Sequence, residues 1–311
     1  MQRVWDTMTK AMYVILEQLN EMLSVEGFLQ VVSNLLHNDS AAIRRKALEL
    51  FNKRVESGRD EFDDQDKDRF VGMLTELRPI LTEQEEMAVA STADTHRGST
   101  DELAINRQTA LWSIDILAQE FAGERPLPFL ECLPPLIATL EAHSDCQKVL
   151  GSGFLCLKSL IAKLGARSLP HFNKFMALIL ASLRDMVDLD MEEEDDEGLT
   201  LDAGESLVVQ AALSALHACV EQLSGFIAPY IPDILSIVLH PTLLDSGDAH
   251  LLSRADALIS AFALKVPPRI LLPPVISHYR VAVQAGTASV KALFKVLLTL
   301  TLTLTLTLRL T

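Results

Sequence analysis

Aromatic residues are scarce in this chain. They make up 5% of its 311 residues, whereas hydrophobic residues make up 49%. Leu and Ala dominate the hydrophobic fraction. That composition favours packed helices over a β-sandwich, whose strands are enriched in Val, Ile, Tyr and Thr. The sequence therefore predicts an all-α protein.

Cysteine is also rare and forms no C-x-x-C pair. The four residues lie scattered in apolar, helix-like stretches: Cys132, Cys146, Cys156 and Cys219. This pattern predicts buried free thiols in a reducing compartment, the cytosol or the nucleus. The short apolar run at residues 13–16 is followed by Glu17, which argues against a signal peptide. We identify no window of about 20 residues that predicts a membrane span.

Basic residues are missing from one long stretch. Residues 188–202 contain nine acidic residues and no Lys or Arg, and the whole chain carries a net charge of −15. Phosphate contacts require clustered Lys and Arg, so the sequence disfavours broad binding of RNA or DNA and leaves room only for an indirect or local RNA contact. The acidic stretch predicts a solvated, flexible insertion over about 188–204.

Signatures of catalysis, cofactor binding and metal binding are missing as well. His217 and Glu221 lie one helical turn apart, but no H-E-x-x-H motif occurs. His143 and Cys146 form a two-ligand fragment without a second pair, whereas zinc sites need three or four ligands. The Gly151–Gly153 segment lacks the third glycine of a dinucleotide loop and is predicted to let two helices pack closely. We predict no catalytic residue, cofactor, metal or small-molecule substrate.

Present throughout the chain is a repeat. Similar helix-opening motifs begin at steps of 42, 59, 42, 59 and 44 residues, at Phe28, Phe70, Phe129, His171, Tyr230 and Pro274. A period near 42 that sometimes grows by 17 is typical of a two-helix unit with loop insertions. Such periods predict a HEAT-type α-solenoid of about six helical hairpins.

Apolar periodicity and helix-end signals divide the chain into predicted helices. A first helix is predicted over 1–23. The predicted hairpins are 26–37 with 41–56, 68–81 with 102–121, 126–142 with 145–164, 169–187 with 204–223, 228–241 with 249–266, and 267–286 with 287–298. The helix over 126–142 should kink at Pro134 and Pro135. A second flexible insertion is predicted at about 82–101, and the solenoid as a whole spans 1–298.

The last residues, 299–311, are a low-complexity tail of alternating Thr and Leu with one Arg309. Alternation with a period of two is a strand pattern. The interpretation we favour is a translated six-nucleotide repeat that is not native structure, and the competing interpretation is an edge strand.

A basic cluster on the second helix of the first hairpin is the candidate partner-docking site: Arg44, Arg45, Lys46, Lys53 and Arg54. One interpretation is a solvated helix flank whose charges pair with Glu49 and Glu56. The other is a docking face for an acidic partner or an RNA backbone.

Four segments resemble a known family: 35–51, 151–160, 207–235 and 266–279, with the runs P-R-I-L-L-P and F-I-A-P-Y the most specific. They are similar to the C-terminal part of the large nucleolar HEAT-repeat protein of the small-subunit processome, in the U3 small-nucleolar-RNA-associated family. The resemblance covers about 25–298. It implies a non-catalytic scaffold in the nucleolus, with other processome proteins and the U3 ribonucleoprotein as partners. It further implies roles in 18S rRNA maturation and in linking it to RNA polymerase I transcription. A HEAT-repeat scaffold of another pathway, such as a transport receptor or phosphatase scaffold, remains the alternative, because fold does not fix function.

Overall fold

The computed structural model describes residues 23–58, 61–83, 93–189, 203–244 and 247–310. These residues are helical with short connections and contain no strand. The chain divides into two compact units, an N-terminal unit up to Cys132 and a C-terminal unit from Leu133. The predicted helix over 1–23 lies almost wholly outside the described residues.

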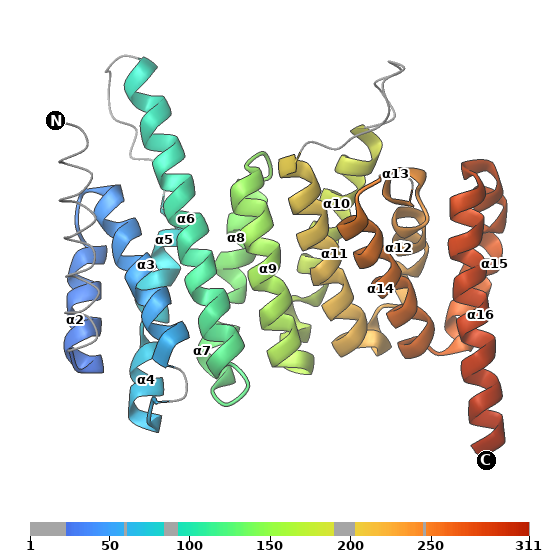
Figure 1. The fold of residues 1–311 in the computed structure, drawn as a ribbon, viewed down its shortest axis with the longest axis horizontal. Coiled ribbons are helices and arrows are strands. Elements are labelled where there is room, and N and C mark those ends of the chain that lie inside the picture. Colours follow the sequence, from blue (N-terminus) through green and yellow to red (C-terminus); the bar gives the residue numbers. More distant parts are fainter. Residues whose placement is uncertain (1–22, 59–60, 84–92, 190–202, 245–246, 311) are drawn as a thin grey trace. The chain divides into compact units, whose positions relative to one another are not determined.

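The N-terminal unit is built from helices in two layers (Figure 1). Its helices are α2 (Val25–Leu36), α3 (Ala41–Gly58), α4 (Asp64–Gly72), α5 (Leu74–Thr82), α6 (Ala93–Phe121) and α7 (Pro126–Leu130). The second helices α3 and α6 pack against each other, and α2 packs against both α3 and α4. Each hairpin therefore buries its apolar face against the next one.

An aromatic cluster fills the centre of the N-terminal unit. The ring of Phe70 lies 5.8 Å from that of Phe51, 4.5 Å from that of Phe62 and 6.5 Å from that of Phe121. Phe51, Phe70 and Phe121 are almost fully buried. Because they come from α3, α4 and α6, this cluster joins both layers of the unit.

The C-terminal unit repeats the same arrangement. Its helices are α8 (Leu133–Ala142), α9 (Gln147–Leu164), η1 (Gly165–His171), α10 (Phe172–Leu189), α11 (Ala203–Leu223), η2 (Ser224–Phe226), η3 (Ala228–Tyr230), α12 (Ile231–Val238), α13 (Pro241–Leu244), α14 (Ala249–Lys265), α15 (Pro268–Ala285) and α16 (Thr287–Leu310). Each of α9, α11 and α14 packs on the next second helix, up to α16, and the first helices α8, α10, α12 and α15 form a parallel series. Two rows of helices in register are the arrangement of a HEAT-type α-solenoid.

Burial refines the register of the repeat. In the first three helical hairpins the opening residues Phe28, Phe70 and Phe129 are themselves buried. In the last three hairpins the buried residue is one position later, at Phe172, Ile231 and Val275. The steps between these buried opening residues are therefore 42, 59, 43, 59 and 44 residues. The predicted period is confirmed, and the buried position moves one residue later from the fourth hairpin on.

Several predicted helix ends are confirmed by local geometry. Ser24 caps α2 by accepting a hydrogen bond from the backbone N–H of Gly27 at 3.2 Å. Gly165 ends α9 with a φ of 53°, a left-handed conformation that glycine adopts without a Cβ clash. Asp248 caps α14 by accepting from the backbone N–H groups of His250 and Leu251.

Prolines and a tight turn divide two predicted first helices. The predicted helix 68–81 is two helices, α4 and α5, with Met73 between them. The predicted helix 126–142 breaks completely at residues 131–132 instead of kinking. Pro134 and Pro135 cannot donate to the carbonyls of Leu130 and Glu131, so the helix ends and restarts there. In contrast, α15 continues through Pro273 and Pro274.

The predicted insertion at 82–101 is wrong in its second half. Residues 84–92 lie outside the described residues, but Ala93–Asp101 form the first turns of α6. The buried face that begins near Asn106 anchors this helix, and adding turns to a formed helix costs little. Of the acidic insertion at 188–204, residues 190–202 lie outside the described residues, and the flanking residues belong to α10 and α11.

The Thr-Leu tail is helical, so the competing interpretation of an edge strand is wrong. The favoured interpretation, a translated repeat that is not native structure, stays a prediction. Helix α16 runs from Thr287 to Leu310. Its first turns carry buried Leu293, Val296 and Leu300 at helical spacing, and the tail extends this anchored helix. Thr299 Oγ1 donates to the carbonyl of Lys295 at 2.9 Å, one turn earlier. Such bonds let threonine fit a helix despite its strand propensity.

Two segments are long and apolar enough to cross a membrane by length and composition, Gln147–Asp185 and Gly204–Phe226. This differs from the sequence-based expectation of no such window. The most apolar windows of these segments are 56% and 67% buried inside the protein. The first segment is also interrupted at Gly165. Both properties are those of core helices, which pass the same composition test.

Candidate functional site

The predicted basic cluster lies on α3, where Arg44 has a structural contact. Its side chain is only 14% exposed. Nη1 donates to the backbone carbonyls of Asn38 and Asp39, at 2.9 and 3.2 Å, and Nη2 lies 3.5 Å from Glu83 Oε1. Arg44 therefore holds the turn between α2 and α3 against the end of α5.

Arg54 has a similar role at the other end of α3. Its Nη2 donates to the backbone carbonyl of Leu23 at 3.2 Å. The guanidinium carbon lies 6.0 Å from the centre of the Phe28 ring, within the range of a cation–π contact. Arg54 thus joins α3 to the start of α2.

The remaining three residues point outward. Arg45 Nε lies 3.8 Å from Glu49 Oε1, and Lys46 Nζ lies 2.9 Å from Glu49 Oε2. Lys53 is exposed and lies two turns after Lys46 on the same face of α3. Ion pairs on an exposed helix surface contribute only about 0.3–0.5 kcal/mol and break readily for a partner.

The cluster predicted from sequence is therefore divided by the fold. Arg44 and Arg54 hold neighbouring helices, whereas Arg45, Lys46 and Lys53 form an accessible basic surface on α3. Docking at this surface stays a prediction. The sequence alone could not separate the two groups, because the carbonyls that Arg44 and Arg54 reach depend on the tertiary packing of α3.

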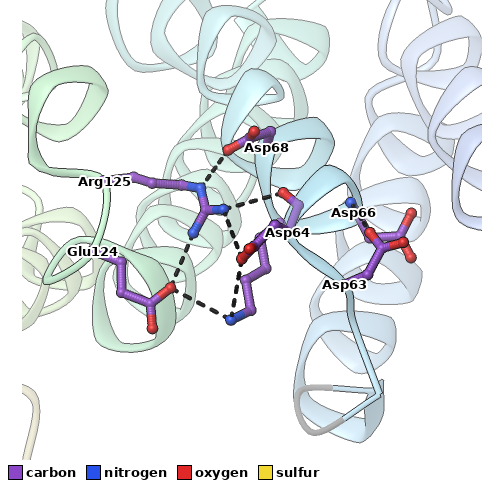
Figure 2. A network of polar contacts seen from close by, with 7 residues as sticks. Asp63, Asp64, Asp66, Asp68, Glu124 and Arg125 are labelled. Carbon is purple, nitrogen blue, oxygen red and sulfur yellow. Dashed lines mark hydrogen bonds and ion pairs between the residues drawn. The ribbon is translucent and has the colours of Figure 1, made fainter.

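A second polar site lies between α4 and the start of α7, and the sequence analysis missed it. Figure 2 shows the guanidinium of Arg125 among the carboxylates of Asp64, Asp68 and Glu124. Nη1 lies 3.0 Å from Glu124 Oε2, Nη2 lies 3.3 Å from Asp64 Oδ1, and Nε donates to Asp68. The hydrogen bonds to Asp68 and then Asp64 raise the pKa of Arg125.

This network sets the position of α7. Arg125 immediately precedes Pro126, the first residue of α7, and its Nη2 also donates to the backbone carbonyl of Asp64 at 3.1 Å. The carboxylates of Asp64 and Asp66 also lie near the N-terminus of α4, where negative charge complements the helix dipole. The acidic run 63–68 was visible in the sequence, but its partner lies 57 to 61 residues away and gave no local signal.

A groove of about 560 Å³ adjoins the network within the N-terminal unit. Its walls include Leu74 and Thr75 of α5 and Pro126 and Leu127 near the start of α7. Arg78 lies on the groove and forms an ion pair with Glu131 at 2.5 Å. The Arg125 network and this second ion pair therefore lie at the groove, whose lining mixes apolar and charged side chains.

Elsewhere, burial favours the neutral form of several titratable side chains. Burial lowers the pKa of His217, which favours a neutral imidazole. Burial raises the pKa of the Cys132 thiol to about 12 and also raises that of Cys219. Cys132, Cys156 and Cys219 are buried and form no disulfide, as predicted, whereas Cys146 is half-buried. Among the residues that the structure describes, no three His, Cys, Asp or Glu side chains form a group suited to a metal ion.

Two rows of helices and a period near 42 residues define the class. The chain is an all-α protein of the HEAT-type α-solenoid class.

Comparison with known proteins identifies its relatives. The chain is 26% identical over 272 residues to a HEAT repeat-containing protein 1 homolog of Dictyostelium discoideum, which covers 87% of the chain and 11% of the relative. It is 28% identical over 282 residues to HEAT repeat-containing protein 1 of Homo sapiens, covering 89% and 12%. It is 22% identical over 285 residues to U3 small nucleolar RNA-associated protein 10 of Schizosaccharomyces pombe, covering 92% and 15%. No family model matches the chain.

These relatives confirm the resemblance predicted from the sequence. The chain is homologous to HEAT repeat-containing protein 1 and matches a C-terminal region of such a protein. It spans only about an eighth of the length of these curated relatives.

Proposed function

We propose that this chain is a non-catalytic scaffold segment in ribosome biogenesis. In this role it contributes to assembly of the small-subunit processome, to processing of the 18S rRNA precursor and to the link with RNA polymerase I transcription. Its partners are other processome proteins and the U3 ribonucleoprotein, and it acts in the nucleolus.

The observation that carries this proposal is similarity along almost the whole chain. Relatives named HEAT repeat-containing protein 1 match 87% to 89% of it, and a relative named for association with U3 small nucleolar RNA matches 92%. The proposal concerns a segment, because the chain covers a small part of each relative. Within that segment, stacked hairpins supply extended surfaces, as expected of a scaffold.

The basic surface of Arg45, Lys46 and Lys53 is the proposed docking site for an acidic partner or an RNA backbone. Three basic side chains on one side of α3 attract such partners by charge, chiefly through the association rate. The net charge of −15 disfavours broad RNA binding, so any RNA contact at this patch is proposed to be local.

A localisation and pull-down experiment tests the pathway. The full chain, fused to a fluorescent tag, is expressed in cultured human cells and compared with the tag alone. We expect enrichment in nucleoli and co-precipitation of U3 small nucleolar RNA. A diffuse cytosolic pool without U3 RNA, or recovery with transport or phosphatase complexes instead, would support the other class of HEAT scaffold and contradict the proposal.

A further inference from the structure

The C-terminal unit contains a long stretch without acidic residues. No Asp or Glu occurs between Asp145 and Asp185, although the whole chain carries a net charge of −15. Basic residues are frequent in the same stretch: Lys148, Lys158, Lys163, Arg167, Lys174 and Arg184. The stretch covers α9, η1 and most of α10, so this part of an acidic chain is locally basic.

Part of this charge lies on the exposed side of the second helices. Helices α9, α11 and α14 lie side by side in one row (Figure 1), and α9 and α11 pack their other sides against α8 and α10. The exposed side of α9 carries Leu155, which is 44% exposed, and half-buried Lys158 three residues later. Extended surfaces across such rows are what solenoid proteins use to bind partners.

Helices α9 and α11 run parallel with a fixed register. In two places a Cβ atom added to a glycine in or directly after α9 would lie 3.8 or 3.9 Å from a side chain of α11: Gly151 with Val208, and Gly165 with Gln222. Both pairs are 57 residues apart in the sequence. Lys158 therefore lies level with Ala215, two residues before the half-buried His217.

Helices α11 and α14 are joined on both sides of Arg254. Ser206 Oγ donates to Asp248 Oδ2 at 2.7 Å. Lys265 Nζ lies 3.0 Å from Glu221 Oε2, about four turns further along both helices. Arg254 is exposed on α14 between these two contacts, so it lies beside the middle of α11.

The electrostatic environment of His217 confirms that the three helices bring cations together. Burial lowers the pKa of His217 most, Glu221 opposes this effect, and the positive charges of Arg254 and Lys158 lower the pKa further. Lys158 and Arg254 form no ion pair with a residue that the structure describes. The acid beside them, Glu221, is already paired with Lys265.

Leu155, Lys158, His217 and Arg254 thus belong to one surface across three helices, which we call the second-helix face. We propose that this face binds an acidic segment of a partner protein. Carboxylates of that segment meet Lys158 and Arg254, and an apolar side chain of it covers Leu155. Complementary charge of this kind selects the partner and speeds its association.

The side chains of the second-helix face favour a peptide over a nucleic acid. Single-stranded nucleic acids stack their bases on exposed aromatic rings. The Phe, Tyr and Trp residues of α9, α11 and α14 are only Phe154 and Phe262, and both are buried. An exposed leucine beside two cations instead suits a segment that mixes carboxylates with apolar side chains.

This inference goes beyond the pathway proposed above, because it specifies a surface and the chemistry of its partner. Binding of a peptide to the purified chain does not depend on nucleolar location, so the two proposals can fail separately.

The test uses the full chain and two synthetic peptides, with binding followed by fluorescence anisotropy. Both peptides carry Leu at the same positions, and their remaining positions are Glu in one and Gln in the other. The net charge of −15 repels the Glu peptide, so the overall charge alone predicts tighter binding of the Gln peptide. We expect the opposite, with the Glu peptide bound at least about tenfold more tightly. Equal binding of both peptides, tighter binding of the Gln peptide, or no binding of either would overturn the proposal.

Variants then locate the site. Arg254→Glu should weaken binding of the Glu peptide several-fold, and its combination with Lys158→Glu should weaken it at least about tenfold. Leu155→Ser should also weaken it several-fold, because it removes the apolar contact. Unchanged binding by these variants would contradict the proposal.

The matched controls make the same change of charge at exposed lysines outside the second-helix face. They are Lys174→Glu on α10 and Lys53→Glu on α3, and both should leave binding unchanged. Because Lys158 is half-buried, Lys158→Gln is measured beside Lys158→Glu. Circular dichroism and urea unfolding verify that each variant folds.

Three other results would identify a different occupant or site and contradict the proposal. The first is binding of a poly-uridine RNA, in place of the Glu peptide, with the same sensitivity to Arg254→Glu. The second is loss of peptide binding in Lys53→Glu, which would place the site on α3. The third is a tenfold gain in peptide affinity when Gln and Asn replace the six acidic residues 192–197, which would show that the chain's own acidic segment covers the face.

Discussion

Gly153 and Leu140 pack so closely that a Cβ atom on Gly153 would lie 2.5 Å from Leu140 Cδ2. Gly153 lies in α9 and Leu140 in α8, the two helices of one hairpin. The prediction that the Gly151–Gly153 segment lets two helices pack closely is therefore confirmed at its second glycine. At Gly151, a Cβ would have only an ordinary contact at 3.8 Å with Val208 Cγ2.

We predict that Gly153→Ala destabilises the chain by about 1–2 kcal/mol, measured as the free energy of unfolding in urea. Overpacking a core costs about 1–3 kcal/mol, and the gain in helix propensity from Gly to Ala offsets up to about 1 kcal/mol of it. Gly151→Ala is the matched control and should be neutral or stabilising, because it gains propensity without a clash.

A double-mutant cycle connects this cost to Leu140. Leu140→Ala alone should cost about 2–5 kcal/mol, since it removes a buried side chain. In that background Gly153→Ala should cost less than in the original chain, because the atom that it meets is absent. Additive effects would show that the contact does not set the helix separation.

The Arg125 network predicts a stability effect that depends on salt. Arg125→Met should destabilise the chain by about 1 kcal/mol in urea unfolding, because it removes the cation that pairs with Asp64, Asp68 and Glu124. Lys67 remains near Asp64 and Glu124 and limits the loss. Added salt should reduce the cost, since screening weakens repulsion among the carboxylates. Arg167→Met, at an exposed arginine of η1, is the control and should change little.

The hydrogen bonds of Asp248 lead us to predict that the stability of the chain depends on pH. Its carboxylate accepts hydrogen bonds from Ser206 Oγ at 2.7 Å and from the backbone N–H of His250 at 2.8 Å, and these bonds lower its pKa, the Ser206 bond most. The charged form is favoured in the folded state. The stabilisation is therefore fully present above the ordinary aspartate pKa near 3.9 and is lost as pH falls through the lower folded value.

Asp248→Asn tests this relation. The variant should have a lower urea midpoint than the original chain at pH 7, and the difference should shrink as pH falls toward about 3. Asp185→Asn, at an exposed aspartate of α10, is the control. A difference that is constant over this pH range would contradict the assignment of the effect to the Asp248 charge.

Because the fold divides the basic cluster on α3 into two groups, we predict that variants of the two groups differ in their effect on stability. Arg44→Ala should destabilise the chain by about 1–3 kcal/mol, because two backbone carbonyls and Glu83 lose a nearly buried donor. Lys53→Glu should change unfolding by no more than about 0.5 kcal/mol, since Lys53 is exposed. Thermal and urea unfolding measure both, and equal losses would show that the division is wrong.

The fold was predictable because local sequence signals mark the start, the end and the buried side of each helix in the repeat. Helix caps such as Ser24, stops such as Gly165 and apolar stripes at helical spacing each act over a few residues. The errors arose where distant packing overrides a local pattern. The Thr-Leu tail follows the helix anchored by Leu293 and Leu300, although its alternation favours a strand.

The candidate site was predictable only in part for the same reason. The sequence shows five basic residues near one another, but not that Arg44 reaches back to Asn38 and across to Glu83. The Arg125 network was missed because Asp64 and Asp68 on α4 lie 61 and 57 residues away from Arg125 in the sequence.

The paired prolines of α15 have a consequence for how this hairpin comes apart. Pro273 and Pro274 have no N–H, so the carbonyls of Arg269 and Ile270 lack the usual donor four residues later. The opening turn of α15 is thereby held to the remainder by two fewer backbone links. On warming, this turn should unfold first, as a short hinge after Val266. The part of α15 that contains Ile276 and Tyr279 should remain helical.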